Sequence, residues 1–225
     1  MENRYCLTFK KEGYAIYTSH LDMQRLFKRA FKRAGIEIAY SHGYNPHPLM
    51  SFVQPLSLGY SSVCEMLEFR TKESYLPEFI TAELAGVMPE GIAVTACERL
   101  EEGKKTLASR CCAAVYEIVI PIGSGDESVL SDDPDDIVSR FLDQKEIIVT
   151  KLNKKKKLVE TDIKDKIQSL EMDIVDNKVL LNTKLDAGSD SNLSPELLLK
   201  AFLPFSGIHT DRSEIEISRL ELICK

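Results

Sequence analysis

The stretch SHLDMQRLFKRAFKRAG, residues 19–35, decides the expected fold of the first part of the chain. Its apolar residues recur at i, i+3, i+4, i+7, i+8 and i+11, a spacing that places them on one face of an α-helix. Ser19 followed by Asp22 is typical of a helix start, and Gly35 is typical of the position just past a helix end. The spacing predicts a helix between Ser19 and Gly35 whose buried face comprises Met23, Leu26, Phe27, Ala30, Phe31 and Ala34.

Strand-like segments surround this helix. Runs of β-branched, aromatic or alternating residues predict extended structure. Strands are predicted at residues 4–11, 36–41, 64–71 and 92–100, with extended structure continuing at 49–56, and a second helix is predicted within residues 75–91, with Pro77 in its first turn. The resulting order, β-α-β-β-α-β, is that of a ferredoxin-like domain.

The same order of elements recurs in the second half. Strands are predicted at residues 113–122, 146–152, within 162–185 and at 214–223, with helices at 133–144 and 194–204. Asp176-Asn177 predicts a hairpin turn. We therefore expect an α+β fold of two tandem ferredoxin-like domains, residues 1–100 and 101–225, with the polar segment Leu100–Arg110 as the linker.

Composition bounds the classes of function. The chain has 225 residues, is 44% apolar and carries a net charge of −6. No window approaches the roughly 20 apolar residues of a membrane span, and the start, MENRYCLTFKKEG, lacks the order of a signal peptide. The six cysteines form no C-x-x-C pair and no three-cysteine cluster, so we expect reduced thiols in a cytoplasmic protein, without an iron–sulfur centre or other cofactor.

Basic residues are concentrated near the start. Residues 1–50 carry eight Lys/Arg against four Asp/Glu, whereas residues 101–225 carry 18 against 24. Five of these cations lie opposite the apolar face of the predicted helix and form what we call the basic stripe: Arg25, Lys28, Arg29, Lys32 and Arg33. Like charges at such spacings repel by about 0.2–0.5 kcal/mol per close pair. The stripe indicates either a solvated face that suits the helix dipole or a strip that binds the phosphates of RNA or another polyanion.

The sequence YSHGYNPHPLMSF, residues 40–52, predicts a stiff loop. Pro46 and Pro48 restrict the backbone on either side of His47, and Gly43 permits a bend. Aromatic and imidazole groups stack on bases, and polar groups read base edges. We predict a recognition loop beside the C-terminal end of the basic helix, in which Tyr40, Tyr44, Asn45 and His47 contact RNA; the alternative is that these side chains only pack the strand ends.

The histidines allow two further interpretations. His20, His42 and His47 are candidate acid–base groups of a metal-independent RNA-processing enzyme, because histidine exchanges protons near neutral pH. The same three could supply metal ligands. No sequence spacing brings them together, so we expect no metal site.

The long segment from Ser19 to Glu65 resembles the radical-SAM-linked family of unknown function. The matching pieces are Ser19-His20-Leu21-Asp22, Arg25, Arg29-Ala30, Arg33-Ala34, Tyr40-Ser41, Gly43 to Pro48, Pro55-Leu56 and Gly59 to Glu65. The segments VYEIVIP, TDIKDKI and AGSDSNLSPELLLKAF extend the resemblance over most of the chain. Members of that family occur alone or attached to the C-terminus of a cobalamin-binding radical SAM protein. The resemblance implies a partner of this kind that carries the chemistry.

Three functions remain open from the sequence. The first is a non-catalytic subunit that binds RNA, such as tRNA or ribosomal RNA, and presents it to the cobalamin-binding radical SAM protein. The second is the histidine-dependent RNA-processing enzyme, because tandem ferredoxin-like domains resemble the repeat-processing RNA endonucleases of CRISPR systems. The third is a protein-interaction adaptor that docks its partner through the acidic second domain.

Overall fold

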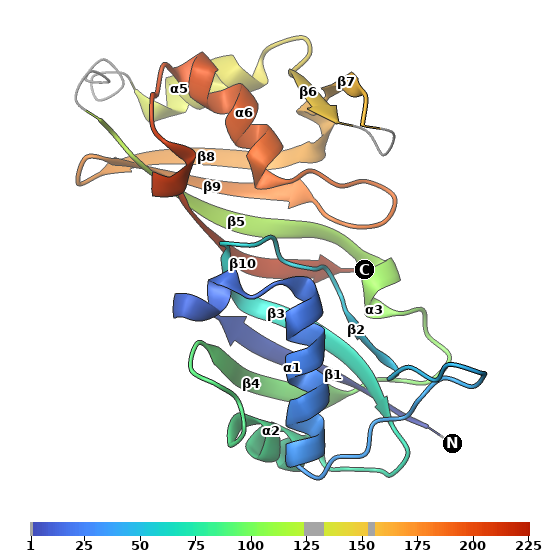
Figure 1. Cartoon of the computed structure of the whole chain (residues 1–225). Helices are drawn as coiled ribbons and strands as arrows, with labels where there is room; N and C mark the ends of the chain where they lie inside the picture. The colour runs from blue at the N-terminus through green and yellow to red at the C-terminus, as the bar shows by residue number, and fades with distance from the viewer. Residues whose placement is uncertain (1, 124–132, 153–155) are drawn as a thin grey trace. The chain divides into compact units, whose positions relative to one another are not determined.

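The computed structural model describes residues 2–123, 133–152 and 156–225. The chain divides into two compact units (Figure 1). Unit 1 comprises Met1–Cys111 with Cys224–Lys225, and unit 2 comprises Cys112–Ile223. In the described part of the chain, no helix combines the length and apolarity needed to cross a bilayer.

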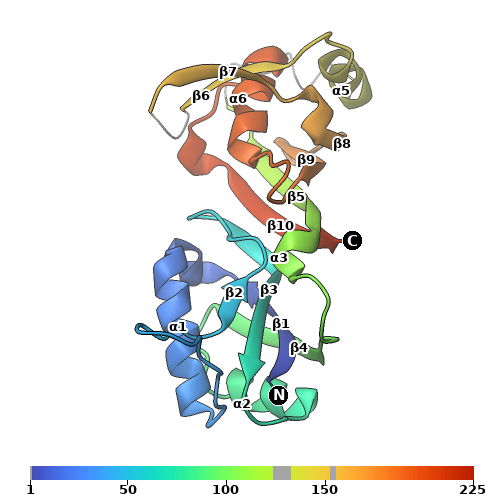
Figure 2. The same ribbon diagram turned by 90° about the vertical axis from the view of Figure 1, so that its right-hand side faces the viewer.

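Unit 1 is an antiparallel sheet with helices packed on it (Figure 2). Its elements in chain order are β1 (Asn3–Lys11), a 3-10 helix η1 (Gly13–Tyr17), α1 (His20–Arg33), β2 (Met50–Phe52), β3 (Ser61–Thr71), α2 (Pro77–Ala85), β4 (Ile92–Arg99) and the short α3 (Leu107–Arg110). β1 lies between β4 and β3 and is antiparallel to both, and β2 pairs antiparallel with β3. The strand order is therefore β4-β1-β3-β2.

The core of unit 1 explains why α1 and α2 lie on the same face of the sheet. Alternate residues of a strand point to one face, and Tyr5, Leu7 and Phe9 of β1 are all buried in one cluster. The same cluster contains apolar residues of both helices and of the neighbouring strands: Met23, Phe27, Ala30, Phe31, Ile80, Leu84, Leu67, Phe69 and Ile92.

The helix predicted from its apolar spacing is confirmed as α1. Ser19 occupies the N-cap, where its Oγ accepts a hydrogen bond from the Asp22 amide at 3.2 Å. Gly35 follows the helix with φ of +68°, a conformation that favours glycine. The predicted helix within residues 75–91 is also present, but it is limited to Pro77–Ala85.

The prediction of a strand at residues 36–41 was wrong. Only two isolated bridges form there, Ile38 with Thr71 and Tyr40 with Pro48. The reason is that β2 pairs with Leu67–Phe69, which leaves little of this edge of β3 for a further strand. The extended stretch predicted at 49–56 is a strand only at Met50–Phe52.

The predicted domain boundary after residue 100 also needs correction, because unit 1 continues to Cys111. The buried Arg4 guanidinium donates hydrogen bonds to the carbonyl oxygens of Lys104 and Lys105, both at 2.9 Å. Glu68 accepts a hydrogen bond from the amide of Leu107 at 2.7 Å. These bonds hold the predicted linker against the sheet of unit 1.

Unit 2 repeats the use of two helices on an antiparallel sheet (Figure 1). Its elements are β5 (Cys111–Pro121), α5 (Pro134–Leu142), β6 (Ile148–Leu152), β7 (Leu158–Asp162), η2 (Lys164–Lys166), β8 (Ile167–Val175), β9 (Lys178–Asp186), α6 (Pro195–Ser206), η3 (Arg212–Glu214) and β10 (Glu216–Cys224). The strand order is β10-β5-β9-β8. β6 lies within the strand predicted at residues 146–152, and it pairs with β7 in a separate two-stranded sheet.

The core and turns of unit 2 follow from its sequence. Phe141 of α5 packs edge-on against Phe202 of α6, with ring centroids 5.2 Å apart. Asp176 and Asn177 have φ of 49° and 61° and join β8 to β9, so the predicted hairpin is confirmed. Helices cover antiparallel sheets in both units, and the predicted α+β class is confirmed.

Candidate nucleic-acid interface

All five side chains of the basic stripe are exposed on α1, whose opposite face is buried. Arg25 donates a hydrogen bond to Asp22 at 3.0 Å and is therefore paired. Within the described residues, no acidic side chain forms an ion pair with Lys28, Arg29, Lys32 or Arg33. The stripe therefore presents four cations that have no ion-pair partner among the described residues.

The acidic residue of α1, Asp22, lies in its first turn. Ser19 donates a hydrogen bond to the Asp22 carboxylate at 2.7 Å, and this bond together with Arg25 lowers the pKa of Asp22. An anionic residue in the first turn also suits the positive end of the helix dipole. The negative charge of α1 is thus confined to its N-terminal turn, and the charged residues in its later turns are all Lys or Arg.

A groove of about 440 Å³ lies at the C-terminal end of the basic stripe. Lys28 and Lys32 line it together with Tyr40, and the Lys28 ammonium is 5.9 Å from the centre of the Tyr40 ring. The floor and rim are formed by Phe31, Gly35, Ile36, Glu37, Ile38 and Lys72. The structure thus brings together three of the predicted RNA-binding residues in one concave surface. Arg25, Arg29 and Arg33 do not line it.

The predicted recognition loop projects from unit 1 between α1 and β2 (Figure 2). Its neck is closed by Ser41 and His47: the Ser41 amide donates to the His47 carbonyl at 2.9 Å, and the Ser41 Oγ lies 2.9 Å from His47 Nδ1. His42 and Asn45 are exposed, and Tyr44 has the exposure of a free side chain. The loop is therefore held at its base and presents an uncovered aromatic ring.

His47 is separated from the groove that contains Tyr40. It lines a different depression of about 240 Å³ with Met50, Ser51, Arg70 and neighbouring residues. His20 lies at the other end of α1, which is about 20 Å long at 1.5 Å per residue. In the described residues, no group of three or more His, Cys, Asp or Glu side chains could hold a metal ion.

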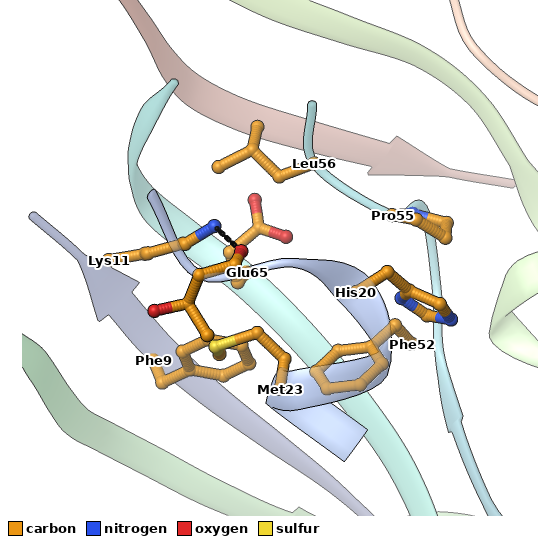
Figure 3. Close-up of a pocket in the computed structure, with 9 residues that line it drawn as sticks. Phe9, Lys11, His20, Met23, Phe52, Pro55, Leu56 and Glu65 are labelled. Atoms are coloured by element: carbon orange, nitrogen blue, oxygen red, sulfur yellow. Dashed lines mark hydrogen bonds between the residues drawn. The ribbon is translucent and has the colours of Figure 1, made fainter. Parts of the chain in front are cut away.

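Figure 3 shows a second site, at the N-terminal end of α1, that contains His20. The cavity holds about 20 Å³, room for one water molecule, and its apolar walls come from Phe9, Met23, Phe52, Pro55 and Leu56. Lys11 and Glu65 are buried in it, and both point into the same space. Lys11 donates a hydrogen bond to the Thr18 carbonyl at 3.0 Å. The exposed His20 ring also lines the cavity and lies edge-on to Phe52, with 5.3 Å between the ring centres.

Lys11 and Glu65 were missed as site residues from the sequence. The available signal was strand alternation: Lys11 lies two residues after Phe9, and Glu65 two residues before Leu67, so both belong to core-facing positions. A charged side chain at a core-facing strand position points into the protein interior. Three of the sequence pieces that carry the family resemblance meet at this cavity, through His20, Pro55-Leu56 and Glu65.

Comparisons with solved structures give distant similarities. The chain is similar to a chain of the "Crystal Structure of a Cbf5-Nop10-Gar1 Complex", with 12% identity and a TM-score of 0.48, covering 97% of this chain and 48% of that one. It therefore spans about half the length of that relative. A second similarity, with 9% identity and a TM-score of 0.28, is to the "Crystal Structure of an Unknown Protein from Galdieria sulphuraria", covering 99% of both chains.

The match to a protein family is more extensive. No curated protein is significantly similar to this chain. The family described as "Uncharacterized protein conserved in bacteria (DUF2344)" matches residues 4–195, which include all the site residues described above. The chain therefore belongs to this bacterial family, DUF2344.

Proposed function

We propose that the chain binds RNA through unit 1 and presents it to a cobalamin-binding radical SAM enzyme, without catalysing the reaction itself. One observation carries the RNA-binding part: the unpaired cations of the basic stripe run into a groove that contains an aromatic ring. Ammonium groups bind phosphates, and bases stack on aromatic rings with about 1–3 kcal/mol per base.

The groove suits a single unpaired nucleotide. Lys28 and Lys32 lie where they can contact the phosphate. The Lys28 ammonium lies over the Tyr40 ring, and this exposed ring is the surface on which we propose that a base stacks, with Lys28 moving to the phosphate. Tyr44 at the loop offers a second stacking surface. Unstacked bases occur in the loops and bulges of tRNA and ribosomal RNA, which are the RNA class we propose.

The radical SAM partner enters the proposal through the family resemblance. The six cysteines of the chain are reduced in this structure, which is compatible with the cytoplasmic location that is also part of this proposal. We further propose that both units are ferredoxin-like domains in tandem. The strand orders β4-β1-β3-β2 and β10-β5-β9-β8 support this, since each corresponds to the fourth, first, third and second strands of a β-α-β-β-α-β unit.

A charge reversal in the groove tests RNA binding. The double variant Lys28→Glu/Lys32→Glu should weaken binding to a pool of tRNA and ribosomal RNA fragments by about tenfold or more, because two phosphate contacts become repulsive. Fluorescence anisotropy at fixed salt measures the affinity. Lys145→Glu/Lys178→Glu makes the same charge change at two exposed positions of unit 2 and should leave the affinity nearly unchanged. Equal losses in both variants, or none in either, contradict the proposed interface.

The partner is tested separately by crosslinking in native cell extract. The expected adducts are RNA on unit 1 and a cobalamin-binding radical SAM protein, identified by mass spectrometry. A protein adduct that persists after nuclease treatment and at high salt, with no RNA adduct, would support the adaptor function instead. RNA adducts with no radical SAM protein would remove the partner from the proposal.

A second candidate, an acid–base enzyme, is supported by the cavity at His20. A proton-exchanging imidazole next to a buried Lys and Glu is an arrangement that general acid–base catalysis can use. If the chain cleaves RNA in EDTA, His20→Ala should reduce the rate by about 10²–10⁴-fold, whereas His42→Ala should not. Absence of cleavage of any RNA in the pool would exclude this candidate for those substrates.

A further inference from the structure

Cys111 and Cys224 lie opposite each other in unit 1, on neighbouring extended segments. The amide of Lys225 donates a hydrogen bond to the carbonyl of Arg110 at 3.1 Å. In an antiparallel arrangement the next pair along is Cys111 with Cys224, and opposite residues alternate between hydrogen-bonded and non-hydrogen-bonded pairs. The two cysteines therefore form a non-hydrogen-bonded pair, with an expected Cα separation of about 4.5 Å.

The environment of Cys224 sets it apart from the other thiols. Cys111 donates a hydrogen bond to its sulfur, and this bond, with the Arg110 guanidinium, lowers the pKa of Cys224 to about 7 although burial opposes the shift. Burial and the nearby Glu98 raise the pKa of both Cys6 and Cys97 to about 12. Cys224 is also only half-buried. At neutral pH it combines thiolate character with access to solvent, the two requirements for a reactive cysteine.

We propose that Cys111 and Cys224 form an oxidant-sensitive dithiol that peroxide closes to a disulfide. The Cys224 thiolate attacks one oxygen of hydrogen peroxide, the O–O bond breaks, and protonation of the departing hydroxide gives water and a sulfenic acid. The Cys111 thiol then attacks that sulfur and releases a second water. Two thiols are oxidised by two electrons in total, and one peroxide is reduced to two waters.

The geometry allows this bond. Disulfides span Cα separations of about 4.4–6.8 Å, so the pair lies at the short end of the range. The position matters because the chain leaves unit 1 after Cys111 and returns at Cys224. The oxidised pair would join these two points covalently, independently of any RNA-binding function.

Peptide mapping of the full chain tests the inference. The reduced protein is treated with hydrogen peroxide, its remaining thiols are alkylated, and the tryptic peptides are compared by mass spectrometry without and with reductant. Cleavage after Arg110 and Arg219 places Cys111 with Cys112 in one peptide and Cys224 in LELICK. The expected product is these two peptides joined, lighter than their sum by two hydrogens and separated by reductant.

Single substitutions identify the sulfur that pairs with Cys224. Cys112→Ser is the matched control, because Cys112 is the direct neighbour and donates a hydrogen bond to the Ile223 carbonyl at 3.4 Å. The crosslink should persist in Cys112→Ser and disappear in Cys111→Ser and Cys224→Ser. If the wild-type protein yields no crosslink, or if only Cys112→Ser removes it, the inference is wrong. The wild-type result stands even if a serine variant fails to fold.

Discussion

Arg4 is the residue that ties the first strand of unit 1 to the segment that leaves it. Its side chain is 2% exposed, and its Nε lies 2.8 Å from the Glu68 carboxylate. The other two guanidinium nitrogens donate to backbone carbonyls of residues 101–105, and the second Glu68 oxygen accepts from the Leu107 amide. Because every charged atom of the pair has a partner, the cost of burying the two charges is offset.

Removal of one residue of the Arg4–Glu68 pair should make the free-energy cost of the remaining buried charge measurable. Glu68→Ala leaves the Arg4 charge buried without its counterion, so the free energy of unfolding should fall by about 3–5 kcal/mol. Urea denaturation measures the change. The control is Glu101→Ala, which removes the exposed ion pair with Lys104 and should lower stability much less. A similar loss in both variants would show that the buried pair is not the stabilising feature.

The Cys224 thiol should show an unusual pH profile. Its pKa is lowered from 9.0 to about 7 by the Cys111 hydrogen bond and by Arg110. Only the thiolate reacts, so the rate of alkylation by iodoacetamide should rise with pH through a midpoint near 7 and level off about one pH unit above it. Mass spectrometry of LELICK follows this rate. Arg110→Ala should move the midpoint to higher pH; a profile centred near 9 in the wild-type protein contradicts the assignment.

At the scale of elements, η1 and β4 meet at a point where only glycine fits. Gly91 has φ of +83°, and a Cβ placed there would lie 2.5 Å from the Glu12 carbonyl oxygen and 2.8 Å from the Ala15 Cβ. The Glu12 amide also donates to the Gly91 carbonyl at 2.9 Å. This contact fixes the start of β4 beside the segment that leads into α1.

Two glycine substitutions separate backbone strain from the steric clash. Gly103 has a similar φ of +79° but nothing within 4 Å of its Cβ position, so Gly103→Ala should cost only about 1–2 kcal/mol. Gly91→Ala adds the clash with backbone and should lower the melting temperature considerably more. Equal melting temperatures for the two variants would mean that the chain relaxes around position 91 without cost.

The elements that the sequence predicted well are those defined by local rules. α1 follows from a 3.6-residue apolar period with a cap, and the β8–β9 turn follows from two residues that tolerate positive φ. Residues 36–41 look like a strand, but pairing depends on a free edge, which no local pattern reveals. The groove at Tyr40 and the cavity at Lys11 and Glu65 likewise depend on which segments the fold brings together.

At the scale of the whole molecule, the uneven distribution of charge along the chain determines where RNA can bind. The net charge of −6 opposes general adhesion to nucleic acid, so attraction must come from the local stripe on α1. Four unpaired cations can neutralise about four phosphates. The logarithm of the association constant should then fall with the logarithm of salt concentration with a slope of about −3 for single-stranded RNA.

Titration of salt in the anisotropy assay measures this slope. The Lys28→Glu/Lys32→Glu variant should have a slope shallower by about one to two units, because two phosphate contacts are lost. The unit 2 control variant should retain the wild-type slope. A wild-type slope near zero would indicate that binding does not depend on the stripe.

During synthesis on the ribosome, the order in which the strands are made affects the folding of the two units differently. The sheet and both packed helices of unit 1 precede Cys111, so this unit can fold while the rest is being made. In unit 2 the first strand made, β5, lies between β9 and β10, which are made near the end. Its apolar residues, including Ile118 and Ile120, therefore await their partners for about 5–20 seconds at usual translation rates. During that interval β5 is a nascent strand with two unpaired edges and exposed apolar residues, a state that is prone to aggregation.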